Sequence, residues 1–279
     1  MAARKPSVVF FGSKPASVAA LAILLERQWD IRCVVPSPQN HCYAPAGPTL
    51  EVFCKQKGLP VILSDDRREF PPADFIISYL FKSRITRLEL ALAKRAALNF
   101  HPGSLPEFAG WSAYSLPILE DAREYGCTCH YMLDEFDSGP ILGECRFLID
   151  ASQETALSLE RKTQIEMIKL FKDFCAAAET GENLPSKEQE RSKRRYLSQN
   201  EFEALKEIPA AADAQMVDRF ARAFWYPPYG GAFICSGKLK LEVIPQIAKN
   251  EVAALVHQDA LKVFLEVVKN HPPRSIHPK

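Results

Sequence analysis

The first half of the chain alternates short runs of apolar residues with stretches in which apolar residues recur every three to four positions. Runs of the first kind predict strands, and stretches of the second kind predict helices. The predicted strands are Ser7–Phe11, Ile31–Val35, Pro60–Leu63, Phe75–Ser78 and Ala96–Phe100. The predicted helices lie near Ala16–Arg27, Leu50–Lys57 and Thr86–Lys94. This alternation favours an α/β fold with a doubly wound, mostly parallel sheet.

The pattern changes in the middle of the chain. Tyr114–Arg123 predicts a helix, and Cys127–Leu133 and Ile141–Ile149 predict a pair of strands. Ser158–Ala178 repeats apolar residues at helical spacing and is expected to close the first domain. The first domain is therefore expected to span residues 1–182.

A polar and charged stretch from Gly181 to Arg195 then interrupts the apolar pattern. This change predicts a linker at about residues 183–195, followed by a smaller α+β domain over residues 196–279 with a helix at Ala214–Ala223. The basic run at residues 191–195 is either a solvated linker face or a place that neutralises phosphate. The polar, Pro-rich end from Asn270 to Lys279 is expected to fray.

Composition narrows the classes of function. The net charge of +1 argues against a general nucleic-acid-binding surface. The apolar runs are too short to span a membrane, and Val8–Phe11 is too short for the core of a signal peptide. We therefore expect a cytoplasmic protein that binds neither nucleic acid nor a membrane. The loop after Phe11 has one glycine where a dinucleotide fingerprint needs three, which argues against a dehydrogenase.

The eight cysteines are scattered, and their spacing shows no Cys-x-x-Cys pair. Cys127 and Cys129 alternate along a predicted strand, so they share one face and are expected to be small core residues. His130 points to the opposite face of that strand, which weakens the case for a metal site there. We expect reduced thiols and no metal.

The strongest candidate for chemistry is an amide, an imidazole and a carboxylate at the ends of two predicted strands. Asn99 and His101 precede a Pro-Gly break, and Asp137 follows the predicted strand Cys127–Leu133 in an Asp-Ser-Gly-Pro turn. Each residue taken alone is also compatible with a local backbone cap or turn. Together they suit acyl transfer, because an amide N–H polarises a carbonyl, an imidazole moves a proton and a carboxylate orients the imidazole. Ligands of open α/β sheets bind at the carboxyl ends of strands.

This ordered set resembles the signature of the formyltransferases that use 10-formyltetrahydrofolate. That family includes methionyl-tRNA formyltransferase, glycinamide ribonucleotide formyltransferase and the sugar-nucleotide N-formyltransferases. The pattern extends over Val8–Leu148, and a weaker likeness to a small C-terminal domain continues in Arg222–Phe233. The resemblance implies a Rossmann-like catalytic domain and a homodimer formed at least partly through the second domain.

The resemblance also implies two loops that bind 10-formyltetrahydrofolate. The first loop follows the fourth predicted strand, and the second precedes Asp137. Their residues are Phe81, Lys82, Ser83, Arg84 and Ile85 in the first loop, and Asp134, Glu135 and Phe136 in the second. For Phe81 and Phe136, ordinary packing is the alternative interpretation.

In the implied reaction a formyl group moves from a folate nitrogen to a primary amine. Asn99 is expected to donate a hydrogen bond to the formyl oxygen, and His101 to accept or relay the amine proton. Asp137 is expected to hold the imidazole in its useful tautomer. Whether His101 or Asp137 is the decisive base stays open at this point.

The acceptor is expected to be small. Ala109 stands where the methionyl-tRNA enzymes typically carry arginine, and the loop after His101 is one leucine shorter than theirs. The aromatic cluster Phe224–Tyr229 can stack on a nucleobase, or equally serve domain packing or a dimer contact. We predict a nucleotide-linked amino deoxysugar of surface-glycan biosynthesis as the acceptor. The expected substrate-binding residues are Ser13, Lys14, Arg222, Phe224 and Tyr229.

Two other functions remain as alternatives. Methionyl-tRNA formylation needs an RNA-binding face and strongly salt-dependent binding. A non-catalytic folate- or nucleotide-binding module can use the same scaffold, because fold alone does not fix function.

Overall fold

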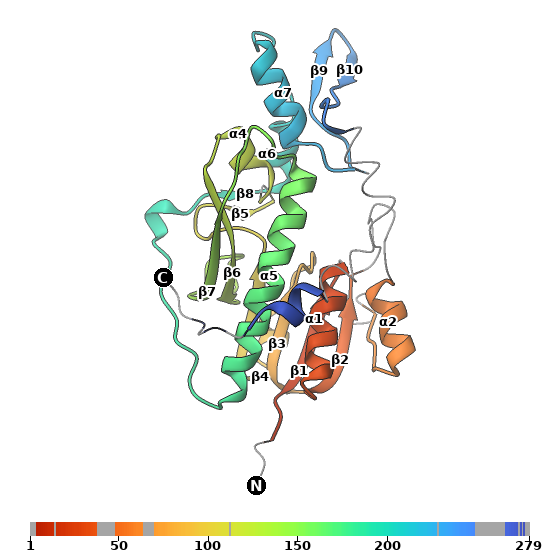
Figure 1. Ribbon diagram of the computed structural model, residues 1–279, viewed down its shortest axis with the longest axis vertical. Helices are drawn as coiled ribbons and strands as arrows, with labels where there is room; N and C mark the ends of the chain where they lie inside the picture. Colours follow the sequence, from red (N-terminus) through yellow and green to blue (C-terminus); the bar gives the residue numbers. More distant parts are fainter. Residues whose placement is uncertain are drawn as a thin grey trace.

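The computed structural model describes residues 4–13, 15–37, 48–63, 70–111, 113–227, 229–248, 266–272, 274 and 276. Within these residues, a six-stranded sheet in the order β2-β1-β3-β4-β6-β7 forms the centre of the molecule (Figure 1). Its strands are β1 (Ser7–Gly12), β2 (Asp30–Pro36), β3 (Ala73–Tyr79), β4 (Ala93–His101), β6 (Glu124–Tyr131) and β7 (Ile141–Leu148). The first four strands are parallel, and β6 and β7 join them antiparallel. The mostly parallel α/β sheet expected from the sequence is therefore present.

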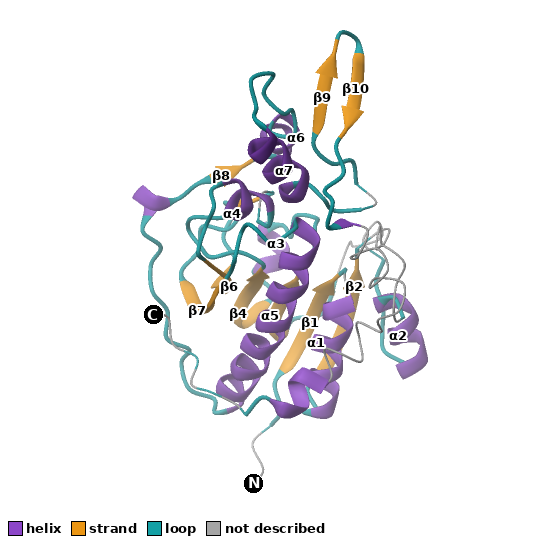
Figure 2. Ribbon diagram, turned by 45° about the horizontal axis from the view of Figure 1, so that its top comes forward, coloured by secondary structure: helices purple, strands orange, loops and turns teal. Residues whose placement is uncertain are grey.

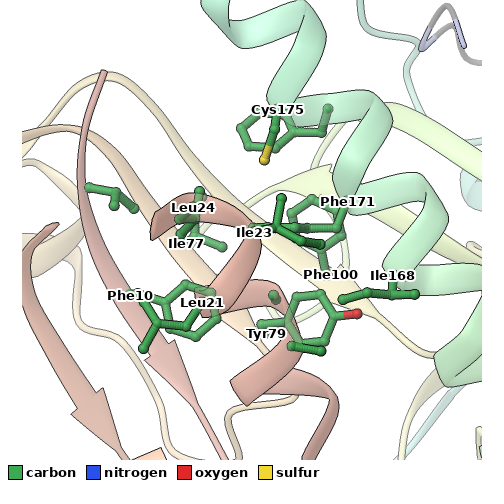
Figure 3. Close-up of a cluster of buried hydrophobic side chains, with 14 of the residues drawn as sticks. Phe10, Leu21, Ile23, Leu24, Ile77, Tyr79, Phe100, Ile168, Phe171 and Cys175 are labelled. Atoms are coloured by element: carbon green, nitrogen blue, oxygen red, sulfur yellow. The ribbon is translucent and has the colours of Figure 1, made fainter. Parts of the chain in front are cut away.

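The two faces of the sheet bury alternate residues of each strand, as the strand period of two requires. On one face, Phe10 packs with residues of α1 (Pro15–Glu26) and α5 (Ala156–Glu179). Figure 3 shows this cluster, in which the Phe100 and Phe171 rings pack edge-on with their centroids 4.9 Å apart. On the other face, Phe11 belongs to a smaller cluster. Buried aromatic rings at this density hold the strands in a fixed register, and so fix where each strand ends.

Local sequence signals set the helix ends. Thr155 accepts a hydrogen bond from the Ser158 backbone N–H and forms a capping box at the start of α5. The helix α2 (Leu50–Lys57) begins after the Thr49 cap and ends at Gly58 in a left-handed conformation. Both helices match the predicted positions within two residues. None of the described helices is long and apolar enough to cross a bilayer.

Three predicted elements differ in the structure. Pro60–Leu63 is not a strand: Val61 makes only an isolated parallel bridge to Val34. The helix predicted at Thr86–Lys94 is the single turn α3 (Arg87–Leu90), because Ala93 pairs with Ala73 and begins β4. The helix predicted at Tyr114–Arg123 is α4 (Ser115–Leu119). In the second and third cases a helix is present within the predicted range, but the predicted range is too long.

The second part of the chain packs against the first. It contains β8 (Tyr196–Leu197), α6 (Gln199–Ala204), α7 (Ala214–Ala223) and the hairpin of β9 (Phe233–Ser236) and β10 (Leu239–Glu242). Phe224 and Ile208 share one buried cluster with Tyr125 of β6 and Leu159 of α5. The hairpin stands away from the central sheet in Figures 1 and 2.

The last described residues do not fray but return to α5, where the dark blue segment of Figure 1 crosses that helix. Lys172 donates to the backbone oxygen of His271 (2.5 Å), and the His271 ring lies 3.1 Å from the Asp173 carboxylate. Val268 and Ile276 are buried in the main core cluster. The expectation of fraying is therefore wrong for residues 270–272, 274 and 276, and residues 273, 275 and 277–279 lie outside the described residues.

Candidate active site

Two polar side chains lie on one face at the end of β4. Asn99 and His101 are two residues apart, so the pleat points them the same way. The antiparallel pairing of β4 with β6 places His130 directly opposite Asn99. The Asn99 side-chain amide donates to His130 Nε2 at 3.1 Å. Sheet register thus brings a second histidine to the pair that the sequence identified.

Asp137 enters the same cluster from the loop between β6 and β7. Its Oδ1 atom lies 3.6 Å from His101 Nδ1, 3.5 Å from His130 Nε2 and 3.4 Å from the Asn99 amide nitrogen. Its Oδ2 atom accepts a hydrogen bond from the Gly110 backbone N–H at 3.0 Å. The structure therefore brings together all three predicted catalytic residues.

The environment of Asp137 favours its charged form. Burial on its own raises the pKa of a carboxyl group. Here His101 and His130, which are positively charged when protonated, and the Gly110 N–H outweigh burial and hold the pKa of Asp137 well below its ordinary value. A carboxylate with so low a pKa binds protons weakly, so it is a poor proton acceptor at neutral pH.

A backbone carbonyl fixes the tautomer of His101. His101 Nε2 lies 2.8 Å from the Phe108 oxygen, and because a carbonyl oxygen can only accept, Nε2 carries the hydrogen. The lone pair of the neutral ring is therefore on Nδ1, which faces Asp137. From the resemblance we expected Asp137 to have this tautomer-fixing role. In the structure Phe108 performs it, and no motif in the sequence indicated that partner.

The Pro-Gly turn after His101 makes this hydrogen bond possible. A Cβ atom added to Gly103 would lie 2.8 Å from the Phe108 oxygen and 2.9 Å from His101 Nε2. Buried Thr128 of β6 donates to the Gly103 oxygen at 2.8 Å and accepts from Leu105 N–H at 3.2 Å. The turn is thus held against β6, and the glycine leaves room for the imidazole.

His130 is a site residue that the sequence analysis missed. Its Nδ1 atom donates to the Tyr131 backbone oxygen at 2.9 Å, which leaves Nε2 to accept from Asn99. The ring is 2% exposed. Strand alternation had already placed it on the face opposite Cys127 and Cys129, and the antiparallel pairing with β4 was the signal still needed.

A cavity of about 280 Å³ opens in front of these four side chains. All eleven predicted catalytic and folate-binding residues line it. Its two loops are tied together, because Arg84 donates to the Asp134 backbone oxygen at 2.9 Å and lies over the Phe136 ring. Phe81 also packs edge-on against Phe11. Its ring therefore both contributes to core packing and lines the cavity.

The predicted acceptor residues are only partly near the cavity. Arg222 is buried, donates to Asp218 and to the backbone oxygens of Ala151 and Glu154, and does not line the cavity. Phe224 is buried in the second cluster. Both contribute to packing of the second part of the chain.

The remaining three acceptor residues differ among themselves. Ser13 is buried and donates to the Leu80 backbone oxygen, and Lys14 lies outside the described residues. The hydroxyl of Tyr229 accepts a hydrogen bond from cavity-lining Lys82 at 2.8 Å. Neither Ser13 nor Tyr229 lines the cavity, but Ser13 is hydrogen-bonded to cavity-lining Leu80 and Tyr229 to cavity-lining Lys82.

Two exposed aromatic residues that we did not predict as site residues also line the cavity. Trp111 is 47% exposed and Tyr196 is 37% exposed, although both rings are large and apolar. Trp111 directly follows β5 (Ala109–Gly110), and Tyr196 lies in β8, which pairs with β5. The pairing in space of two distant segments gave no sequence signal.

Comparison with known proteins identifies a family for the central part of the chain and a shared fold for most of it. Residues 64–173 match the family model described as formyl transferase. The N-formyltransferase from Helicobacter canadensis, in complex with folinic acid and dTDP-3-aminofucose, superposes with a TM-score of 0.69 at 19% identity, covering 84% of this chain and 85% of that one. WlaRD, a sugar 3N-formyl transferase solved with dTDP and 5-N-formyl-THF, gives 0.70 at 19% identity over 83% of each chain.

A 4-N formyltransferase from Francisella tularensis gives a TM-score of 0.68 at 17% identity, covering 85% of this chain and 96% of that one. These identities are low, so the superpositions establish a shared fold, and the match over residues 64–173 adds the family of the central part. Residues 64–173 therefore match the formyl transferase family, and the chain shares its fold with sugar N-formyltransferases.

Proposed function

We propose that this protein is an N-formyltransferase that moves a formyl group from 10-formyltetrahydrofolate to the primary amine of a nucleotide-linked amino deoxysugar. One observation carries the proposal. Asn99, His101 and Asp137 converge at one end of a cavity whose walls are the two loops expected to bind the folate. The solved neighbours with this fold include enzymes crystallised with folates and dTDP-linked ligands.

The cavity suits a reduced folate. Apolar side chains of Leu80, Leu90 and Met132 line it and can contact both faces of a pterin ring. Backbone groups of the two loops can pair with the donors and acceptors on the ring edge. Arg84 lines the same cavity and supplies positive charge for the carboxylates of the folate tail. When bound, the folate supplies the formyl group.

Asn99 is suited to polarise the formyl oxygen. Its amide nitrogen carries two hydrogens, directed at His130 (3.1 Å) and at Asp137 (3.4 Å). The second contact is long for a hydrogen bond. The formyl oxygen can replace it at little cost, and the amide N–H then stabilises the negative charge that develops on that oxygen.

His101 is the better proton acceptor of the two candidates. The amine must lose a proton, and the low pKa of Asp137 makes that carboxylate a weak base. The free Nδ1 lone pair of His101 faces the cluster while Phe108 holds Nε2–H. Asp137 then stabilises the imidazolium that forms, 3.6 Å away. The imidazolium returns this proton to the folate nitrogen as the bond between that nitrogen and the formyl carbon breaks.

The acceptor would approach along the aromatic side of the cavity. Trp111 and Tyr196 expose apolar ring area there, as a surface that stacks on a nucleobase requires. The Tyr114 ring stacks on Tyr226, and Tyr226 on Tyr229, which extends this side towards Lys82. Lys82 can pair with a phosphate oxygen. We assign base recognition to Trp111 and Tyr196 in place of Phe224.

We further propose a cytoplasmic homodimer that makes its product for surface-glycan biosynthesis. The β9–β10 hairpin supports the dimer. Leu239 and Leu241 lie two residues apart on β10 and are 65% and 54% exposed, and nearby Ile244 is 63% exposed. Apolar residues on one face of a projecting hairpin are suited to an interface with a second copy.

A mass-spectrometric screen tests the function. The protein is incubated with 10-formyltetrahydrofolate and a panel of nucleotide-linked 3-amino and 4-amino deoxysugars, with His101→Ala as the control. The expected result is a gain of one formyl group on at least one sugar, absent with the control variant. Incorporation of labelled formyl into charged initiator tRNA without turnover of any sugar would identify a tRNA enzyme. Folate binding without turnover of any acceptor would identify a binding module.

A further inference from the structure

The segment 187–197 runs along the second site loop, where Gln189 and Arg194 contact residues 135–139, although its polar composition predicts a linker. We call it the strap. At its start, Lys187 pairs with Ile141 at the beginning of β7 through two backbone hydrogen bonds of 2.7 and 2.8 Å. At its end, β8 pairs with β5, beside the Gly110 N–H that binds Asp137. The strap is therefore attached at both ends to segments that build the cavity.

Gln189 lies near the start of the strap and is 9% exposed. Its side-chain amide donates to the Asp137 backbone oxygen at 3.0 Å and to the Gly139 backbone oxygen at 2.7 Å. One amide group thus uses both of its hydrogens on the turn that carries the catalytic carboxylate. A solvated linker residue has no such pair of buried contacts.

The backbone of Asp137 needs support of this kind. Its φ angle is +51°, in the left-handed region that residues other than glycine enter at a cost. A strained conformation at a functional site persists when the surroundings over-determine it. The Gln189 amide binds the carbonyl of Asp137 itself, so it stabilises the backbone orientation that aims the carboxylate at His101 and His130.

Arg194 holds the neighbouring part of the loop. Its guanidinium donates to the Phe136 backbone oxygen at 2.7 Å, lies 3.2 Å from the Glu135 carboxylate and packs over the Tyr196 ring. Its side chain is 17% exposed. Arg191, three residues earlier, is exposed. The basic run therefore contains one arginine built into the site and one in solvent.

We propose that Gln189 and Arg194 are positioning residues for formyl transfer, which fix the Asp137 turn against the histidines. The proposal rests on the proposed function, because it assigns to Asp137 a role in that reaction. Gln189 acts on the backbone of Asp137, and Arg194 acts on the residue before it. Neither side chain touches the reacting atoms.

The test compares Gln189→Leu, which keeps volume and removes both donors, with Gln199→Leu at an exposed helix position. It also compares Arg194→Ala with Arg191→Ala, an identical change in the same basic run. We expect Gln189→Leu to lower kcat by about tenfold or more, with KM for the folate within about twofold. Arg194→Ala should lower kcat less, because Gln189 still holds the turn, and both control variants should match wild type.

The pKa of Asp137 separates positioning from general loss of stability. If the carboxylate moves away from His101 and His130 in Gln189→Leu, the pKa of Asp137 rises, because those two rings supply the positive charge that lowers it. A role in stability alone would lower Tm and leave the pKa of Asp137 in place. Unchanged kcat in both Gln189→Leu and Arg194→Ala, or lower kcat without a rise in the pKa of Asp137, would overturn the proposal.

A readout without turnover keeps this test separate from the proposed function. The carboxyl ¹³C resonance of Asp137, assigned by its loss in Asp137→Asn, is titrated in wild type and in the four variants. The midpoint should rise in Gln189→Leu and in Arg194→Ala but not in the two controls. If no acceptor is ever formylated, the proposed function fails, and this titration still decides whether the strap positions Asp137. Should Gln189→Leu fail to fold, the two arginine variants decide the outcome.

Discussion

The direction in which His101 presents its lone pair depends on one backbone oxygen. Phe108 accepts from Nε2, so Nδ1 is the nitrogen that can take a proton. In many catalytic histidines a carboxylate fixes the tautomer. Here the carboxylate of Asp137 is left to stabilise charge, while a carbonyl from a neighbouring loop sets the tautomer.

Gly103 should therefore matter for activity although it touches no substrate. In Gly103→Ala the new Cβ would contact both the Phe108 oxygen and His101 Nε2 at less than 3 Å, so the hydrogen bond between them must lengthen or break. We expect kcat to fall by roughly tenfold or more, since a misoriented catalytic group is costly. Steady-state kinetics measure this, and Gly230→Ala, where an added Cβ meets nothing within 4 Å, is the matched control. Equal kcat in the two variants would contradict the role of the turn.

Substitutions at Asn99, His101 and Asp137 should lower turnover without weakening folate binding. Asn99→Ala removes the N–H aimed at the formyl oxygen, a loss of about 3–4 kcal/mol of transition-state stabilisation in comparable sites. His101→Ala removes the proton acceptor, and Asp137→Asn removes the charge that stabilises the imidazolium. We expect most turnover to be lost in each, with folate affinity measured by calorimetry largely unchanged. Near-wild-type turnover in Asn99→Ala or His101→Ala would refute the assignment.

Asp137 also predicts how stability depends on pH. Its pKa in the folded protein is lower than its ordinary value of 3.8. Such a group stabilises the folded state at pH values above its unfolded pKa, and that contribution disappears as pH falls through the folded pKa. Asn tolerates the left-handed backbone, so Asp137→Asn isolates the charge. Urea unfolding should show a difference between wild type and variant that is level from about pH 7 to pH 5 and narrows below about pH 4. A difference that narrows already near neutral pH would contradict it.

Sequence alone could identify Asn99, His101 and Asp137, because their order and their places at strand ends form a recognisable pattern. It could not identify His130, whose role depends on the register between β4 and β6. Gln189 is harder still, since its hydrogen bonds reach across 50 residues of sequence to a turn. Non-local pairing carries no local pattern.

At the scale of elements, apolar periodicity predicts the strands and the long helices, because the residues at the periodic apolar positions are the ones that are buried. The helix predicted at Thr86–Lys94 was too long because Ala93 has a strand partner, Ala73, that its own neighbours do not reveal. The polar stretch after α5 has linker composition but is fixed by backbone and side-chain hydrogen bonds from Lys187 onward. A polar composition indicates exposure to solvent. A fixed strap on the surface is exposed to solvent just as a flexible linker is, so composition does not distinguish them.

Limited proteolysis should distinguish the two parts of that stretch. Residues 181–183, 185 and 186 are exposed and lie between the end of α5 and the first strap hydrogen bond. We expect a broad-specificity protease to cut there first and to spare residues 189–197. N-terminal sequencing of the fragments measures the position. First cuts inside the strap, or inside the sheet, would contradict this division.

At the scale of the whole molecule, the projecting hairpin predicts the state of association. Leu239→Lys combined with Leu241→Lys places two charges on the face that we expect to be buried between copies. Sedimentation should show a dimer for wild type and a monomer for the variant at micromolar concentration. Leu148→Lys, at an 83% exposed leucine elsewhere, is the control and should remain a dimer. A wild-type monomer would remove the dimer from the proposal.

The return of the last described segment to α5 bears on the order in which the protein can be made. Val268 and Ile276 complete a cluster whose other members include residues of β1, α1 and α5. The residues of β1, α1 and α5 leave the ribosome long before residue 276 does. Part of the apolar surface of the nascent sheet therefore stays exposed until residue 276 has been added. Exposed apolar surface of this kind attracts chaperones and favours aggregation. Val268 and Ile276 therefore cover this apolar surface only after residue 276 has been synthesised.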